Sequence, residues 1–214
     1  MSDILNLSTV NVTVNDYVAI VTMNNPPVNA QNRQFHEDVT LVFDVLSDSE
    51  DVRAIILTGA GKCFSAGADI KSRTAGKSEL GEHWGHSRRV RECFYSIMEC
   101  KKPVIAAING PALGAGLAVA ASADILIASE NASIGLPEIN VGLLGGGRHA
   151  MRLFGHSKTR RLMLTGKRLD GAELYRLGVV EECVSNEKLM ETALEIAIEI
   201  ASKSPVAMIL AKGT

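Results

Sequence analysis

The sequence predicts an α/β fold built as a single domain of 214 residues. Two short and wholly apolar segments, AIILT at residues 54–58 and PVIAAI at residues 103–108, are typical of strands that are covered on both faces. Segments with apolar residues at helical spacing alternate with such strands. A domain of this length buries roughly 70% of the surface of its unfolded chain, so we expect a sizeable core.

The first elements are predicted to be a hairpin and a helix. Residues 10–14 and 17–23 alternate apolar and polar positions around Asn15-Asp16, which indicates two antiparallel strands joined by a tight turn. The prolines of NPPV interrupt this pattern. Residues 32–46 then carry apolar side chains at helical spacing, and we expect a helix there.

The rest of the chain continues the alternation and then becomes mostly helical. After the strand at 54–58 we expect helices at 80–100, 117–122, 149–154, 157–164, 171–177 and 187–202, and strands at 103–108, 124–128 and 179–184. A further helix is expected to begin after Pro205. Because a domain rarely ends there, we expect the sequence to be a truncated piece of a longer chain.

Composition argues against several classes of protein. The net charge is −2, with lysine and arginine scattered among acids, so we predict no nucleic-acid partner. The short RRVR run at residues 88–91 is typical of a solvated helix face. The amino terminus lacks the features of a signal peptide, and every long apolar stretch is interrupted before about 18 residues, so no membrane association is predicted.

Cysteine and histidine spacing gives no indication of a metal site. The four cysteines form no CxxC pair, which favours reduced thiols in a cytoplasmic compartment. His83 and His86 lie three residues apart, but no further ligand motif accompanies them. We therefore predict no bound metal.

Two loops of small residues are the first candidates for a functional site. FSAGADI at residues 64–70 lets another molecule approach the main chain closely, and NGPALGAG at 109–116 passes directly into a helix. The first N–H groups of a helix have no intrahelical partner, and two such donors aimed at one oxygen form an oxyanion hole. For either loop alone, tight packing of a helix on a strand is the preferred interpretation.

A carboxylate follows these loops at Glu138, in the segment SIGLPEINVGLLGGG. Backbone donors can stabilise a developing negative charge, and a glutamate can move a proton, so the combination suits chemistry through an enolate. Neither loop matches a phosphate-binding or dinucleotide-binding motif, and no G-x-S-x-G motif of a serine hydrolase occurs. Those classes are excluded.

Six segments together resemble the enoyl-CoA hydratase/isomerase, or crotonase, family. They are NNPPVNAQN (24–32), FSAGADIK (64–71), KPVIAAINGPALGAG (102–116), ASADILIAS (121–129), IGLPEINVGLLGGG (134–147) and LTGKRLDGAELYRLGVVEECV (164–184). The resemblance implies a spiral of ββα units over residues 1–186 and the start of a carboxy-terminal helical region at 187–214. It also implies an acyl-CoA thioester substrate of fatty acid metabolism, no permanently bound cofactor, and a homotrimer or a dimer of trimers.

The resemblance assigns roles to individual residues. The N–H groups of Ala68 and Ala115 would be the oxyanion donors, Glu138 the acid/base, and the N–H of Gly146 would help to position a water or the carboxylate. The residues implied to bind the substrate and its CoA portion are Lys62, Ala66, Ala68, Asp69, Ile70, Lys71, Leu113 and Gly114, with Lys62 and Lys71 near the phosphates.

Ala118 departs from the pattern of the hydratases that use two glutamates, because it stands where they carry the first carboxylate. Glu138 could shuttle a proton between Cα and Cγ, as in the double-bond isomerases of the family. It could instead act on water with another polar group, as in the hydroxycinnamoyl-CoA hydratase-lyases. Asn140, Arg148 and His149 are the nearby polar residues, and the sequence leaves open which of them faces the substrate. A catalytically weak homologue that serves as a binding or scaffold subunit is the remaining alternative.

Overall fold

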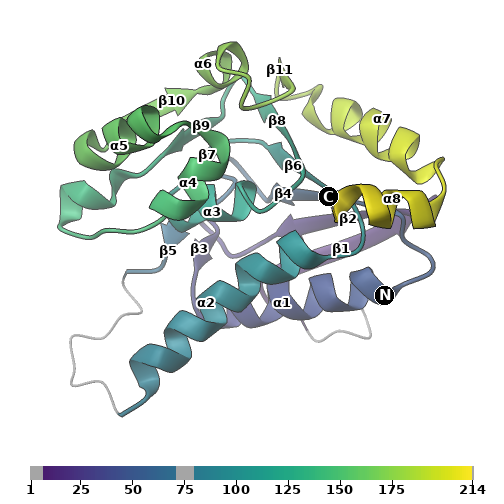
Figure 1. Ribbon diagram of the computed structural model, residues 1–214, viewed down its shortest axis with the longest axis horizontal. Helices are drawn as coiled ribbons and strands as arrows, with labels where there is room; N and C mark the ends of the chain where they lie inside the picture. Colours follow the sequence, from purple (N-terminus) through teal and green to yellow (C-terminus); the bar gives the residue numbers. More distant parts are fainter. Residues whose placement is uncertain (1–6, 71–79, 214) are drawn as a thin grey trace.

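Residues 7–70 and 80–213 are described by a computed structural model of the protein (Figure 1). Its centre is a six-stranded sheet with the order β1-β2-β4-β6-β8-β11. Strands β1 (Val10–Asn15) and β2 (Val18–Met23) pair antiparallel, and each later neighbour pairs parallel. The sheet is therefore a hairpin extended by parallel strands, as the sequence predicts.

The hairpin turn lies one residue later than predicted. Asn15 pairs with Val18, so Asp16 and Tyr17 form the turn, with φ angles of 47° and 65°. Two-residue hairpin turns favour positive φ at both central residues, because that geometry matches the twist of the strands. Tyr17 was expected in the second strand and instead occupies this left-handed conformation.

The parallel strands β4 (Ala54–Gly59), β6 (Val104–Ile108), β8 (Ile125–Ser129) and β11 (Glu182–Val184) form the core. Every residue of β4 and β6 is buried, which confirms the interpretation of these apolar runs. Alternate side chains of these strands belong to two separate apolar clusters, one on each face of the sheet.

Helices cover both faces of the sheet. Helices α1 (Arg33–Asp48) and α2 (Glu82–Glu99) lie side by side and contribute to one cluster, and α7 (Leu189–Ala201) contributes to the other (Figure 1). Helix α1 begins where predicted, because the Asn32 side chain accepts a hydrogen bond from the Phe35 N–H at 2.8 Å.

Five short strands were not predicted. They are β3 (Ala30–Gln31), β5 (Gly67–Ala68), β7 (Pro111–Leu113), β9 (Ser133–Gly135) and β10 (Arg168–Asp170). Strand β3 pairs with β5, and the other three form a sheet with the order β10-β9-β7. Each of β4, β6 and β8 is thus followed by a short strand and then by helical structure. This repetition is the spiral of ββα units that the resemblance implies.

Apart from the short 3-10 helix η1 (Pro137–Val141), which was not predicted, the remaining helices follow the predicted order. They are α3 (Ala115–Ala120), α4 (Gly147–Leu153), α5 (His156–Thr165), α6 (Gly171–Arg176) and α8 (Pro205–Lys212). The strand predicted at 179–184 is shorter, because Gly178 and Val179 are bonded back to the end of α6. In the described part of the chain no helix combines the length and apolar character needed to cross a membrane.

Candidate active site

The first small-residue loop, between β4 and β5, is held by a buried asparagine. Asn29 Nδ2 donates to three backbone carbonyls, those of Ala60 at 3.0 Å, Cys63 at 2.7 Å and Phe64 at 3.3 Å. These bonds satisfy carbonyl groups that the loop cannot pair within itself. The loop is consequently fixed from outside, by a residue more than thirty positions earlier in the chain.

Ser65 joins the first loop to the second through its backbone. Its N–H donates to the Pro111 carbonyl at 3.1 Å, and its own carbonyl accepts from the Leu113 N–H at 2.9 Å. Pro111 and Leu113 are the ends of β7, which leads directly to helix α3. The two loops are therefore one bonded unit rather than separate connections.

The Ser65 side chain ties the first loop to residues 29–31. Its Oγ donates to the Asn29 carbonyl at 2.7 Å and accepts from Gln31 Nε2 at 3.1 Å and from the Gly67 N–H at 3.3 Å. Ser65 is fully buried. Neither Ser65, Asn29 nor Gln31 was singled out from the sequence, since no pattern marks a small polar residue as a buried junction.

The two predicted donors lie on adjacent stretches of backbone. A Cβ built on Gly67 would lie 2.5 Å from the Leu113 carbonyl oxygen and 3.1 Å from the Ala115 nitrogen, and Gly67 has a φ of +91°. Only glycine fits such an approach. Ala68 follows Gly67 in β5, while Ala115 is the first residue of α3 and has no intrahelical acceptor for its N–H.

The side chain of Glu138 lies against the second loop. A Cβ built on Gly114 would lie 2.5 Å from Glu138 Oε1 and 2.9 Å from Glu138 Cδ. Gly114 has a φ of +57° and donates its N–H to the Gly135 carbonyl at 3.0 Å. The carboxylate therefore sits over the residue that precedes Ala115, so the fold brings the proton-transfer candidate to a donor loop.

Glu138 is in an environment that favours its neutral form. Its Oε2 is buried and accepts no hydrogen bond from any residue in the described ranges. Burial raises the pKa of this carboxyl, and its backbone N–H opposes the change more weakly. A carboxyl whose pKa moves toward neutrality can both accept and return a proton at ordinary pH.

Ala118 offers no second carboxylate. It lies one helical turn after Gly114, to whose carbonyl its N–H donates at 3.2 Å, and it is 1% exposed. Only a methyl group points from this position. Within residues 7–70 and 80–213, no three or more His, Cys, Asp or Glu side chains are grouped in a way that could hold a metal ion.

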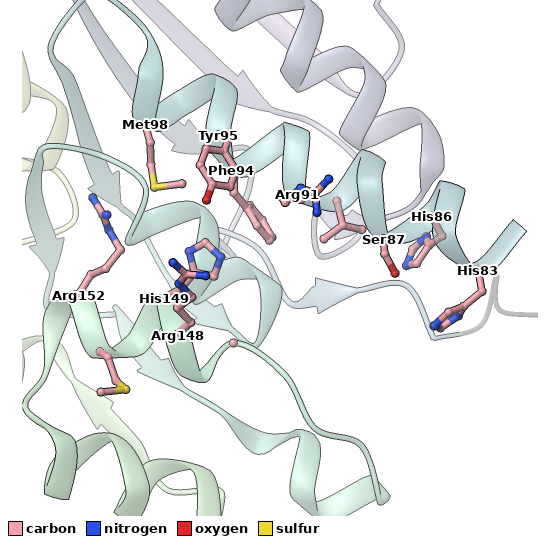
Figure 2. A pocket seen from close by; sticks show the side chains of 13 residues that line it. His83, His86, Ser87, Arg91, Phe94, Tyr95, Met98, Arg148, His149 and Arg152 are labelled. Carbon is pink, nitrogen blue, oxygen red and sulfur yellow. The ribbon is translucent and has the colours of Figure 1, made fainter. Parts of the chain in front are cut away.

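A cavity of about 670 Å³ lies between α2 and α4 (Figure 2). Gly146, which precedes α4, is one of its lining residues. A Cβ built on Gly146 would lie 3.6 Å from the Gly114 carbonyl oxygen. Arg148 and His149 line the cavity too, whereas Asn140 packs against Gly166. Of the three polar residues that the sequence offered as partners of Glu138, two therefore line the cavity and one packs elsewhere.

His149 is a second polar side chain of interest in this cavity. Its ring packs edge-to-face on Phe94, with centroids 4.7 Å apart, and its Nδ1 is buried without a hydrogen bond from the described residues. Burial lowers its pKa, and the charges of Arg152 and Arg148 lower the pKa further. The imidazole is therefore held in its neutral form.

The residues implied to bind CoA lie around β5. Lys62, Ala66 and Ile70 are exposed, and Leu113, within the second loop, is buried. Asp69 is half-buried and donates its N–H to the Gln31 carbonyl at 3.0 Å. Lys71 lies outside the described residues. These assignments remain predictions.

Comparison with known proteins identifies the family. The profile of the enoyl-CoA hydratase/isomerase family matches residues 13–214. A short-chain-enoyl-CoA hydratase of Clostridium acetobutylicum is 40% identical over 200 residues, which cover 91% of this chain and 76% of the relative. A (7aS)-7a-methyl-1,5-dioxo-2,3,5,6,7,7a-hexahydro-1H-indene-carboxyl-CoA hydrolase of Mycobacterium tuberculosis is 38% identical over 188 residues, covering 87% and 75%.

The fold is equally similar to solved structures. The crystal structure of enoyl-CoA hydratase from Bacillus anthracis is 34% identical and has a TM-score of 0.89, and the match covers 96% of this chain and 81% of that one. Fold, order of motifs and family profile agree. This chain belongs to the enoyl-CoA hydratase/isomerase family of enzymes.

Proposed function

We propose that the protein binds an unsaturated acyl-CoA thioester, stabilises its enolate with the N–H groups of Ala68 and Ala115, and moves protons with Glu138. One observation carries this proposal: the Glu138 carboxylate lies against Gly114, directly before a predicted donor. A base beside the hydrogen-bond donors is the arrangement that enolate chemistry requires.

The loops and the glutamate would act on different atoms of the substrate. The thioester carbonyl oxygen would accept both N–H groups and gain negative charge as the Cα–H bond breaks. Loss of a single donor of this kind typically raises a barrier by ~2.7–4 kcal/mol. Ionised Glu138 would take the proton from Cα and, once protonated, return it.

Two reactions fit a single carboxylate. In double-bond isomerisation, Glu138 would take a proton from Cα and deliver it to Cγ, which needs no second acid. In hydration, hydroxide from water adds to Cβ and a proton to Cα, so a second polar group would have to orient the water. His149 in the adjoining cavity, whose Nδ1 has no hydrogen-bond partner among the described residues, is the candidate for that role. The same group could serve a lyase of the hydroxycinnamoyl-CoA type.

The proposal is tested by turnover of a panel of 2-enoyl-, 3-enoyl- and aryl-enoyl-CoA thioesters by the protein and by its Glu138→Gln variant. We expect turnover by the wild-type protein and a loss of about 10²–10⁴-fold in the variant, the usual contribution of a general acid/base. The product identifies isomerase, hydratase or lyase. Equal rates would remove Glu138 from the chemistry, and absence of turnover with every thioester would favour the scaffold alternative.

Assembly and location are proposed from the family resemblance. We propose a homotrimer, or a dimer of trimers, that works in the cytoplasm with no cofactor besides the CoA of its substrate. Sedimentation should then give a mass at least three times the 22.8 kDa of one chain. A 22.8 kDa species would contradict it.

A further inference from the structure

The cavity beside Gly146 has an unusual distribution of charge. Figure 2 shows side chains of α2 and α4 facing one another across it. Two apolar side chains, Phe94 and Met98, form part of its wall. The charged side chains that line it are the three arginines Arg91, Arg148 and Arg152, and three histidines line it as well. No aspartate or glutamate is among the lining residues.

The arginines of the cavity are not neutralised within the described structure. Arg152 Nε donates to the Ala121 carbonyl at 2.9 Å, which accounts for one of its donors. Neither Arg91 nor Arg148 forms an ion pair with a carboxylate in the parts of the chain that the structure describes. Like charges that line one concave surface repel one another, and a bound anion would relieve that repulsion.

The cavity adjoins the proposed reaction site. Gly146 lines it and lies beside the Gly114 carbonyl, and Glu138 also lies against Gly114. A thioester carbonyl held at Ala68 and Ala115 would therefore have this cavity within reach of its acyl chain. The volume of about 670 Å³ is within the range of small-molecule sites.

We propose that the preferred acyl group ends in a second carboxylate, which Arg91 and Arg148 bind while Phe94 and Met98 contact the methylene groups. The substrate class is then an ω-carboxyacyl-CoA rather than a plain alkyl enoyl-CoA. This inference rests on the proposed function. Guanidinium groups suit the task because they are always charged and can bind a carboxylate with two parallel hydrogen bonds.

Binding of saturated thioesters tests the proposal without any chemistry. Glutaryl-CoA and valeryl-CoA carry five-carbon acyl groups and differ in the terminal carboxylate. Calorimetric titration of the full chain should give a glutaryl-CoA affinity about tenfold above that of valeryl-CoA. Arg91→Met and Arg148→Met should each weaken glutaryl-CoA binding about three- to tenfold, which is the range expected for a partly buried charge pair. Both variants should leave valeryl-CoA binding unchanged.

Arg88 supplies a matched control on the same helix. It is exposed on α2 and does not line the cavity, so Arg88→Met should alter neither affinity. Equal or tighter binding of valeryl-CoA by the wild-type protein would overturn the proposal, as would equal weakening of both thioesters by the two cavity variants. Unchanged turnover in Glu138→Gln overturns the proposed function instead and leaves the binding preference standing. Failure of both thioesters to bind would overturn both.

Discussion

At the scale of single residues, burial of the Glu138 carboxyl destabilises the fold when that carboxyl is ionised. Burial disfavours its charged form and raises its pKa above the ordinary value of 4.5, and a hydrogen bond from its own backbone N–H opposes this change more weakly. The folded state then holds this proton more tightly than the unfolded chain. The protonated carboxyl therefore stabilises the fold fully at pH values below its ordinary pKa. This stabilisation is lost as the pH rises through the pKa of Glu138 in the folded state.

Glu138→Gln should accordingly stabilise the fold at pH 7 while it removes activity. The glutamine keeps the shape of the side chain and carries no charge to bury. We expect the melting temperature of the variant to exceed that of the wild-type protein at pH 7, and the difference to shrink toward pH 4, where Glu138 is protonated. Melting curves at both pH values measure this. A wild-type protein more stable than the variant at pH 7 would contradict the assignment of a destabilised carboxylate.

Gly114 should be essential for placing the Glu138 carboxylate. In Gly114→Ala the new methyl group would meet Oε1 at 2.5 Å, so the carboxylate must move. A displacement of about 1 Å at a reacting group can lower a rate about 10²-fold. Gly178→Ala is the control, because Gly178 also has a positive φ, +67°, but nothing lies within 4 Å of the added Cβ. Loss of turnover in both variants alike would show that backbone strain, rather than Glu138, is responsible.

At the scale of elements, the attachment of the first loop to residues 29–31 depends on the Ser65 side chain. Ser65→Ala removes three hydrogen bonds of a buried hydroxyl and leaves the Asn29 carbonyl without that donor. We expect a loss of about 1–3 kcal/mol in unfolding free energy, and reduced turnover as β5 shifts relative to α3.

Ser129 is the matched control for Ser65. It is equally buried, but its Oγ has no hydrogen-bond partner among the described residues. Ser129→Ala should therefore be neutral or stabilising and leave turnover unchanged, because it removes a polar group that burial already penalises. Denaturant titration of both variants measures the difference. Equal destabilisation would mean that the Ser65 bonds contribute little.

Lys212 links helix α8 to the start of strand β6. Lys212 Nζ lies 2.8 Å from Asp124 Oδ2 and donates to the Lys102 carbonyl at 3.0 Å, and its side chain is 9% exposed. Asp124 in turn accepts from the Val104 N–H at 2.7 Å at the start of β6. Lys212→Met should lower the unfolding free energy by about 1–3 kcal/mol, since it leaves Asp124 unpaired. Lys203→Met, which removes an exposed pair with Glu199, should change stability little.

The elements that could be predicted from the sequence are those long enough to show a repeating pattern of apolar residues. Residues 54–58 and 103–108 are continuous apolar runs, and helix α1 has a capping residue and a regular apolar face. Strands of two or three residues, such as β3 and β5, are too short for any pattern. Their formation depends on pairing with a segment far along the chain, as Ala30 does with Gly67.

At the scale of the whole molecule, the spiral accounts for the position of the site. Each ββα unit ends its long strand at the same edge of the sheet, so loops at residues 59–67 and 109–115 become neighbours although some fifty residues separate them. Glu138 belongs to the third unit, which contains β8, β9 and η1, and lies against the second of these loops. The sequence indicated the loops and the carboxylate separately. The bonding of the two loops through Ser65 and the basic cavity beside Gly146 could not be predicted, because both depend on contacts between residues that are far apart in the sequence.

The central claim is that Glu138 moves the proton at Cα of a thioester. It is tested most directly by incubating a 3-enoyl-CoA with the protein in D₂O and following deuterium entry at Cα by NMR. We expect incorporation by the wild-type protein and a rate at least about 10²-fold lower in Glu138→Gln. Incorporation at equal rates by the two proteins would contradict the claim.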